Sequence, residues 1–435
     1  MIKQYLSYIK TNVDWLGYIP VSWSTCKLGR LSRSGMGQTI LREMLAEELS
    51  ASTLPVYSAS ENSELFGYFE SPTVRLDAGD IIVGARGSIG MARFVSESCT
   101  CTQTTIWIKL DTKVVAPRFA YWSLTGGRTA LFPFDQTAIP MLTTEQVRSA
   151  CIALPPMPEQ TAIAAFLDRE TAKIDALVEE QKRLIDLLKE KRQAVISHSV
   201  TKGLNPDAPM KDSGIEWLGE VPEHWEVAPL KRWAVVQTGV AKGKDLSDVE
   251  TINVPYLRVA NVQDSYIDLT EVANIDIAAN ALERFRLRAG DVLMNEGGDF
   301  DKLGRGHIWN GEIDPCIHQN HVFAVRPHGV MPEWLNYFTS SSTAQFYFML
   351  NSKQSTNLAS ISSSNLMELP VPRPPRSEQE LIISSIERQL SELTAMRTLA
   401  EQSTDFLQER RAALISAAVT GKIDVRRTVE EEVAA

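Results

Sequence analysis

The sequence lacks a long apolar run and has few cysteines. No stretch of about 18 consecutive apolar residues occurs in its 435 residues, which argues against a transmembrane helix. Its first ten residues do not combine a basic segment with the apolar segment of a signal peptide, so we expect a cytoplasmic protein. The five cysteines show no Cys-x-x-Cys spacing, which disfavours both a disulfide framework and a zinc site.

Motifs of common catalytic sites are also missing. The sequence contains neither a Gly-x-x-x-x-Gly-Lys-Ser/Thr phosphate loop nor the Asn/Asp-Pro-Pro-aromatic motif of nucleobase methyltransferases. Three glycines at three-residue spacing in residues 84–90 lack the Gly-x-Gly start of a dinucleotide loop. Cys316, His318 and His321 lack a second pair of zinc ligands. We therefore expect no catalytic, cofactor-binding or metal-binding residues on this chain.

Acidic side chains outnumber basic ones. The sequence has 54 aspartates and glutamates against 44 lysines and arginines, for a formal net charge of -10. Non-specific binding to nucleic acid depends on neutralising phosphates, and no segment of the sequence forms a basic tail. A nucleic-acid role would therefore have to depend on local patches or on a basic partner.

The chain contains an internal duplication. Residues 14–23, Asp-Trp-Leu-Gly-Tyr-Ile-Pro-Val-Ser-Trp, return at 216–225 as Glu-Trp-Leu-Gly-Glu-Val-Pro-Glu-His-Trp, an offset of 202. Residues 190–197, Glu-Lys-Arg-Gln-Ala-Val-Ile-Ser, return at 409–416 as Glu-Arg-Arg-Ala-Ala-Leu-Ile-Ser, an offset of 219. The change in offset places the length differences in the middle of each half. A period near 200 residues is too long for a solenoid and predicts two copies of one domain.

Both halves have the same internal order, which predicts an α+β fold with two α/β domains, each followed by a long helix. Short β-rich runs come first, punctuated by Gly, Pro, Asn and Asp. A stretch without Pro or Gly follows in each half, at 160–200 and at 377–420, and Gly203 and Gly421 come after them as stop signals. Smaller correspondences support the pairing of the halves: Gly37 with Gly239, Gly79-Asp80 with Gly290-Asp291, and Glu159-Gln160 with Glu378-Gln379.

The two long helices carry heptad patterns, which predict that they pair as an antiparallel coiled coil. The alternative is that each helix packs on its own domain as an amphipathic cap. The predicted seam consists of Ile163, Leu167, Ile174, Leu177, Leu184, Leu188 and Val195 in the first helix and Ile382, Ile386, Leu393, Met396, Leu407 and Leu414 in the second.

Polar side chains stand in loops at matching places of both halves. Arg and Lys pair with guanine in direct readout of DNA, and Asn and Gln pair with adenine. Taken singly, each loop could equally be a solvated turn. The candidates for DNA contact are Arg86, Ser88, Arg93, Gln103, Thr104, Gln136 and Thr137 in the first half, and Asn295, Asp299, Lys302, Arg305, Gln319, Asn320, Ser355 and Thr356 in the second.

These patterns together predict six segments. They are a first domain at 1–157, a helix at 158–202, a linker at 203–213, a second domain at 214–375, a second helix at 376–423 and a frayed tail at 424–435.

In combination and in duplicate, these features resemble the specificity subunit (S subunit, HsdS) of type I restriction-modification systems. The similarity extends from about Asp14 to Gly421. The sequence departs from the family pattern at 369–379, which carries two extra residues, and in the first half, where Gly-Ala-Arg-Gly-Ser replaces the Asn-Glu-Gly-Gly-Asp loop. The segments that carry the resemblance are the Trp-Leu-Gly…Pro…Trp openings at 15–23 and 217–225, the Gly-Asp strand with the loop at 295–307, the Leu-Pro-Pro-Met-Pro-Glu-Gln run at 154–160 and the heptad helix after it.

The resemblance implies two target recognition domains, each reading one half of a split, asymmetric double-stranded DNA site, and a coiled coil that sets the spacer between the half-sites. It also implies two modification subunits that bind S-adenosylmethionine and methylate adenine N6, and restriction subunits that use ATP and Mg²⁺. This chain would be non-catalytic and hold no cofactor. Lys182, Arg183, Lys189 and Arg192 on the outer face of the first helix are candidates for docking the modification subunits, although a solvated helix face would look the same.

Two other classes of function stay open on sequence alone. A fused or degenerate methyltransferase or nuclease would bind S-adenosylmethionine or a divalent metal as an isolated chain. A scaffold that does not bind DNA would use the coiled coil to hold two protein-binding domains, and it would fail to bind DNA even with its partner present.

Overall fold

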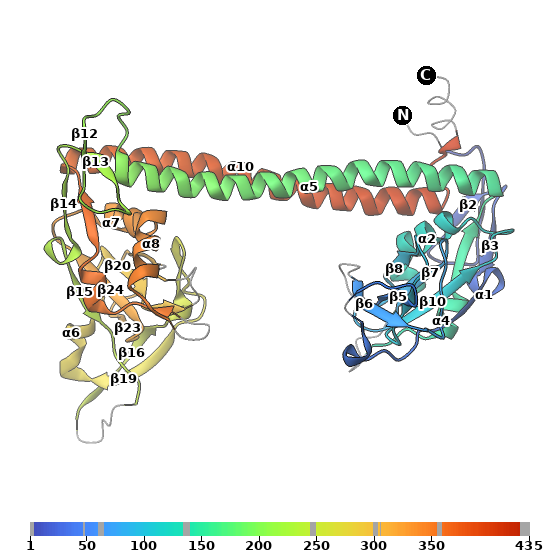
Figure 1. The fold of residues 1–435 in the computed structure, drawn as a ribbon, viewed down its shortest axis with the longest axis horizontal. Helices are drawn as coiled ribbons and strands as arrows, with labels where there is room; N and C mark the ends of the chain where they lie inside the picture. Colours follow the sequence, from blue (N-terminus) through green and yellow to red (C-terminus); the bar gives the residue numbers. More distant parts are fainter. Residues whose placement is uncertain are drawn as a thin grey trace. The chain divides into compact units, whose positions relative to one another are not determined.

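The computed structural model describes residues 4–46, 48–59, 65–133, 140–243, 249–298, 303–304, 306–354 and 359–426. The chain divides into two compact units, which we call the first and the second unit: Met1–Lys182 with Glu401–Ala435, and Arg183–Ala400. Both mix strands and helices (Figure 1), and the predicted α+β fold is confirmed. Within the described ranges, no helix is long and apolar enough to cross a bilayer.

The first unit is built from short strands and helices that precede a long helix. They are β1 (Tyr8–Lys10), β2 (Tyr18–Pro20), β3 (Ser24–Lys27), α1 (Leu28–Leu31), β4 (Ser32–Met36), η1 (Arg42–Met44), β5 (Thr53–Tyr57), β6 (Leu65–Glu70), β7 (Ile81–Gly84), β8 (Ala92–Phe94), β9 (Thr100–Cys101), β10 (Thr105–Leu110), α2 (Pro117–Gly126), α3 (Arg128–Leu131), α4 (Thr144–Ser149) and β11 (Cys151–Leu154), followed by α5 (Met157–Lys202).

The second unit repeats this order with additional elements. They are β12 (Met210–Asp212), β13 (Glu220–Pro222), β14 (Glu226–Pro229), η2 (Leu230–Arg232), β15 (Ala234–Thr238), β16 (Thr251–Leu257), η3 (Val259–Asn261), β17 (Val262–Gln263), β18 (Tyr266–Ile267), β19 (Ala273–Ala278), η4 (Ala279–Ala281), α6 (Leu282–Phe285), β20 (Asp291–Asn295), β21 (Gly297–Gly298), β22 (Gly306–Trp309), β23 (Ile317–His318), β24 (Val322–Pro327), α7 (Pro332–Thr339), α8 (Ser342–Asn351), β25 (Lys353–Gln354), β26 (Ala359–Ser360), α9 (Ser363–Met367) and β27 (Pro370–Arg373), followed by α10 (Arg376–Val419).

Sheet topology confirms the duplication. The antiparallel sheet β4-β10-β7-β8 of the first unit corresponds to β15-β24-β20-β22 of the second, and the mixed sheet β6-β5-β9 corresponds to β19-β16-β23. The pairs β1-β2 and β3-β11 correspond to β12-β13 and β14-β27. The β17-β18 hairpin and the β21-β26-β25 sheet of the second unit have no counterpart in the described part of the first, which accounts for the changing offset between the halves.

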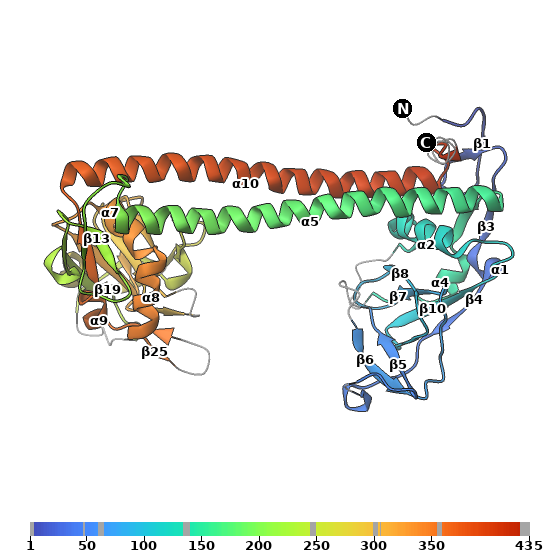
Figure 2. The same cartoon turned by 45° about the horizontal axis from the view of Figure 1, so that its top comes forward.

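Both long helices contribute to the core of each unit. In the first unit, Ile163 and Leu167 near the start of α5 share a core with Ile415 and Val419 near the end of α10. In the second unit, the last part of α5 shares a core with the first part of α10, through Val195, Val200, Ile382 and Ile386 among others. The helices therefore pair in opposite directions, as predicted, and lie side by side in both views (Figures 1 and 2). They also cap their own domains, so the two alternatives of the sequence analysis hold together.

One seam of the predicted coiled coil is displaced by one residue. Leu177, Leu184 and Met396 are 50%, 41% and 53% exposed, which contradicts their assignment to the seam. Val178 is buried instead, and Ile185 is half-buried. A heptad alternates steps of three and four residues. The predicted seam has a step of three residues where the structure has a step of four. Of the other predicted seam residues, Leu393, Leu407 and Leu414 are half-buried, while Ile163, Leu167, Ile174, Leu188, Val195, Ile382 and Ile386 are buried.

Two predicted segment boundaries need correction. The linker at 203–213 contains a strand, because Met210–Asp212 pairs with Glu220–Pro222 just as β1 pairs with β2. The tail is ordered at its beginning: Val425 is buried and the guanidinium of Arg426 bonds the carboxylate of Asp424 at 2.6 Å. Residues 427–435 lie outside the described ranges.

A buried glutamine ties the start of each long helix to its domain. The side chain of Gln160 accepts from the N–H of Ala116 at 2.8 Å and donates to the carbonyl of Pro155 at 2.9 Å. Gln379 likewise accepts from the N–H of Met331 at 2.9 Å and donates to the carbonyl of Pro374 at 2.9 Å. The repeated Glu-Gln pair thus has a structural role in both units.

Candidate nucleic-acid interface

In each unit two polar loops meet because the strands that carry them are neighbours. In the first unit β7 pairs with β10, and the backbone N–H of Ala85 after β7 donates to the carbonyl of Thr104 before β10 at 2.8 Å. In the second unit β20 pairs with β24, and the N–H of Glu296 donates to the carbonyl of His321 at 2.9 Å. The same hydrogen bond therefore joins corresponding loops in both units.

A third loop crosses these loops at a glycine. A methyl group on Gly37 would lie 2.1 Å from the carbonyl oxygen of Thr102, and one on Gly239 would lie 2.1 Å from the carbonyl oxygen of His318. Only a hydrogen atom fits at this distance, so both positions require glycine. The paired glycines seen in the sequence thus mark the closest backbone approach at this edge of each unit.

Isolated bridges after these glycines show which residues correspond. The residue after Gly37 bridges Thr102, and the residue after Gly239 bridges Gln319, both in parallel orientation. Gln103 of the first unit therefore corresponds to Asn320 of the second. The order of polar residues in the sequence alone would pair Gln103 with Gln319, one residue away.

Polar side chains of the first unit surround this edge. Arg86 is exposed, and its Nε lies 3.1 Å from the sulfur of Met141. The guanidinium of Arg93 lies 3.4 Å from the ring centroid of Tyr57, a cation–π contact. The amide oxygen of Gln103 accepts from the N–H of Ile40 at 3.2 Å.

Two more predicted residues of the first unit are held by their neighbours. The hydroxyl groups of Thr104 and Thr102 lie 2.7 Å apart. Ser88 is only 8% exposed, which corrects its prediction as a contact presented to DNA. The turn that carries Ser88 folds back on β7, and the carbonyl of Ser88 accepts from the N–H of Met91 at 3.1 Å.

In the second unit a chain of hydrogen bonds runs across the corresponding edge. The amide nitrogen of Asn320 lies 3.3 Å from Nε2 of His321, and Nδ1 of His321 lies 2.7 Å from the carboxylate of Glu296. Asn320 and Gln319 are half-buried and His321 is exposed. The sequence analysis missed Glu296 and His321 as a pair because 25 residues separate them.

Asn295 does not present its side chain at this edge. It is 3% exposed, and its amide nitrogen donates to the carbonyl of Val262 at 2.9 Å, which corrects its prediction as a base contact. The remaining candidates, Gln136, Thr137, Asp299, Lys302, Arg305, Ser355 and Thr356, lie outside the described residues.

Cys316 and His318, beside and on β23, are buried in the protein interior. The imidazole of His318 is fully buried, its Nδ1 donates to the carbonyl of Val322 at 2.7 Å, and burial lowers its pKa to about 4. Burial raises the pKa of the Cys316 thiol to about 12. In the part of the chain that the structure describes, no three His, Cys, Asp or Glu side chains gather in a way that could hold a metal ion.

The repeated Gly-Asp motif braces the strands that carry the loops. Asp291 accepts from the N–H of Arg288 at 2.8 Å and forms a two-pronged ion pair with Arg326 of β24, with both nitrogen–oxygen distances at 2.7 Å. In the first unit Asp80 accepts from the N–H of Asp77 at 2.9 Å and lies 3.6 Å from the ammonium group of Lys109 on β10. The aspartate therefore joins the two central strands in both units.

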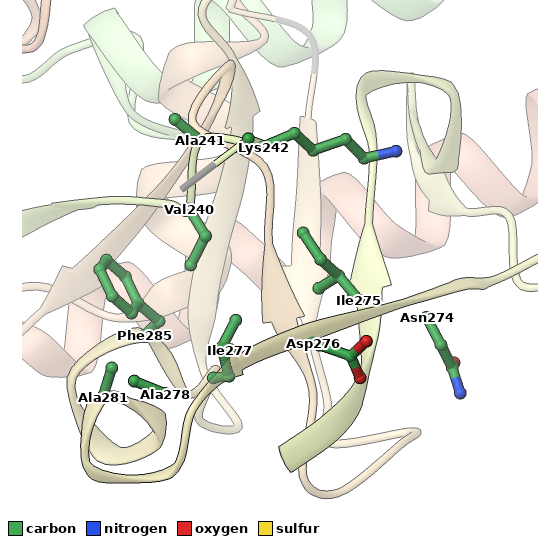
Figure 3. Close-up of a pocket in the computed structure, with 11 residues that line it drawn as sticks. Val240, Ala241, Lys242, Asn274, Ile275, Asp276, Ile277, Ala278, Ala281 and Phe285 are labelled. Carbon is green, nitrogen blue, oxygen red and sulfur yellow. The ribbon is translucent and has the colours of Figure 1, made fainter. Parts of the chain in front are cut away.

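A cavity adjoins the loops of the second unit (Figure 3). Its volume is about 450 Å³, and it lies between β19, α6 and the loop after β15. Ile275, Ile277 and Phe285 give it an apolar floor, and Lys242 extends along its upper side. The carbonyl of Val240, another lining residue, accepts from the backbone N–H of Asn320 at 3.1 Å, so cavity and loop share a wall.

Comparison with known proteins gives a consistent set of relatives. Residues 20–186 match the family model of the type I restriction modification DNA specificity domain. The putative type I restriction enzyme MjaX specificity subunit of Methanocaldococcus jannaschii is 28% identical over 169 residues, which is 38% of this chain and 39% of that protein. The EcoBI specificity subunit of Escherichia coli is 25% identical over 322 residues, 71% of this chain and 66% of that protein. The matched regions thus span less than two thirds of these two relatives.

Solved structures show the same fold. A chain from a type I restriction-modification system, studied for its complex assembly and conformational transition, aligns over 92% of this chain and 98% of its own length with a TM-score of 0.67 and 15% identity. The crystal structure of the HsdS subunit from Thermoanaerobacter tengcongensis aligns over 93% of this chain and 98% of its own length with a TM-score of 0.52 and 15% identity. Residues 20–186 thus match a type I restriction modification DNA specificity domain, and the chain has the fold of these solved structures.

Proposed function

We propose that this chain is the DNA-specificity subunit of a type I restriction-modification complex, with one half of a bipartite, asymmetric site read by each unit. The observation that carries the proposal is the pair of corresponding loop edges. The hydrogen bond that joins the loops and the bridge after the glycine are the same in both units, whereas the side chains differ, with Gln103 and Thr104 in the first unit against Asn320 and His321 in the second. Matching frames with different polar groups suit the reading of two unlike half-sites.

The chain's charge supports a role that depends on partners. A net charge of -10 disfavours strong DNA binding by the chain alone, because phosphate contacts supply most non-specific affinity. We propose that two modification subunits supply much of this contact, bind S-adenosylmethionine and methylate adenine N6 on a flipped base. Restriction subunits that use ATP and Mg²⁺ complete the proposed complex. On this proposal the chain itself is non-catalytic and holds no cofactor.

For the docking of the modification subunits, side chains of α5 offer two kinds of contact. Lys182 and Lys189 are exposed but already paired, with Glu179 at 2.7 Å and with Asp186 at 2.9 Å. Arg192 donates to the hydroxyl of Ser265 at 3.1 Å within its own unit. Arg183 is exposed. Exposed leucines, including Leu184 and Leu187 in the second unit, add apolar surface to the same helix and support the docking proposal.

The proposal is tested by expressing the chain together with a modification subunit and sequencing the host DNA for N6-methyladenine. A single bipartite motif with two different halves and a fixed spacer is the expected result. An assembled complex that binds S-adenosylmethionine but methylates no bipartite motif would favour the scaffold alternative. Binding of S-adenosylmethionine to the isolated chain would favour the enzyme alternative.

A further inference from the structure

We propose that Asn320 reads an adenine in the half-site of the second unit, and that His321 and Glu296 position its amide for this contact. The inference rests on the proposed function and deepens it by assigning one base contact to one side chain. It also assigns the opposite amide orientation, and therefore a contact that only donates, to the corresponding Gln103 of the first unit.

The orientation of the Asn320 amide follows from the hydrogen-bond chain. A carboxylate can only accept, so Nδ1 of His321, 2.7 Å from that of Glu296, carries a proton and donates to it. When the ring carries its proton on Nδ1, Nε2 is an acceptor. It lies 3.3 Å from the amide nitrogen of Asn320, which donates to it. This bond turns the nitrogen of the amide toward His321.

The groups that remain on Asn320 complement adenine. Its second N–H and its carbonyl oxygen have no partner in the described part of the chain. In the major groove adenine presents N7 as an acceptor and the N6 amino group as a donor, and an asparagine amide bonds both. The adenine is not the methylated one, because a flipped base leaves the groove.

Gln103 is held the other way round. Its amide oxygen accepts from the backbone N–H of Ile40 at 3.2 Å, and its NH₂ group has no partner among the described residues. A group that only donates suits an acceptor on a base, such as O6 or N7 of guanine or O4 of thymine. Two amides at corresponding backbone positions therefore present different groups to a base.

The backbone that carries Asn320 is fixed before DNA binds. Its N–H donates to the carbonyl of Val240 at 3.1 Å, and the neighbouring Gly239 leaves no room for a side chain against the carbonyl of His318. A contact group on a fixed backbone loses little conformational freedom on binding, and this favours specificity.

The test compares the methylated motifs of variants in the assembled complex with the modification subunit. Asn320→Ala should lower the preference for adenine at one position of one half-site by roughly tenfold and leave the other half unchanged. Asn320→Asp should shift that position toward cytosine, because a carboxylate accepts from the cytosine amino group. Gln103→Ala should relax one position in the opposite half, which identifies the half read by each unit.

The positioning role has its own matched variants. Glu296→Ala removes the acceptor that holds the proton of His321 on Nδ1, so it should relax the same position as Asn320→Ala. Glu296→Asp keeps a carboxylate and should retain the motif. The proposal is overturned if Asn320→Ala and Asn320→Asp leave every position of the motif unchanged, or if the position that they relax is not an adenine. Failure of the proposed function looks different, because the wild-type complex would then methylate no bipartite motif.

Discussion

At the scale of single residues, glycine is required in this fold for two different reasons. Gly17 and Gly421 both have a positive φ, of +59° and +71°, a conformation that costs other residues about 1 to 2 kcal/mol. Around Gly17 there is open space, whereas a methyl group on Gly421 would lie 2.3 Å from Cδ of Pro20. Substitutions at these two glycines therefore distinguish the cost of backbone strain from the cost of steric overlap.

We expect Gly421→Ala to destabilise the protein by about 2 to 5 kcal/mol, because steric overlap adds to the strain. Gly17→Ala is the matched control and should cost only about 1 to 2 kcal/mol. Thermal unfolding followed by circular dichroism measures both. Equal losses for the two variants would show that the contact with Pro20 has no energetic weight.

Stability should also depend on the protonation of His318. Its pKa is about 4 in the folded protein, against 6.5 as the ordinary value. Between these pH values the unfolded chain takes up a proton that the folded chain does not. The contribution of the neutral imidazole to the free energy of unfolding is therefore present above about pH 6.5 and is lost as the pH falls toward 4. The loss amounts to about 3 kcal/mol. Urea unfolding of the wild type and of His318→Gln at pH 7.5 and pH 4.5 measures this loss as the difference between their changes in the free energy of unfolding. An equal change in the two proteins would contradict the expectation.

At the scale of elements, the seam of the paired helices can be tested with adjacent residues. Val178 is 8% exposed, whereas Leu177 beside it is half exposed. We expect Val178→Ala to destabilise the protein by about 1 to 3 kcal/mol through lost burial and Leu177→Ala by less than about 0.5 kcal/mol. Thermal unfolding of the two variants decides between the seam in the structure and the seam predicted from the sequence, since the order would reverse if the latter were right.

The elements show which features sequence reasoning can reach. The long helices were predictable because proline and glycine mark their ends, and α5 begins at Met157 and stops before Gly203. The phase of the seam was not predictable, because steps of three and four residues fit the same leucine pattern. The pair of Glu296 and His321, like the burial of Asn295, depends on strand register and on loops meeting in space. No local pattern in the sequence contains that information.

At the scale of the whole molecule, the first unit is assembled from both ends of the chain (Figure 2). Residues from 401 onward belong to it, and Ile415, Ala418 and Val419 lie in its core. The hydroxyl of Tyr5 donates to Glu159 at the start of α5, and Arg426 lies 3.8 Å from the same carboxylate. The beginning and the end of the described chain therefore meet at one carboxylate.

We expect a chain that ends at residue 400 to lose the first unit selectively, because four buried side chains leave its core while the second unit keeps all its residues. Limited proteolysis with mass spectrometry should show rapid cleavage between residues 65 and 133 and slower cleavage between 306 and 354. Equal protection of both segments would mean that the first unit is stable without α10. The full-length chain treated in parallel is the control.

The crossing glycines at 37 and 239 have a consequence for how specificity can change over time. They hold the loop backbone through contacts that involve no side chain of the reading residues. If the chain reads DNA as proposed, a single codon change at position 320 alters the base preferred without a refolding cost. New restriction specificities could then arise by point mutation alone, and a host would need to change its own methylation pattern in the same step.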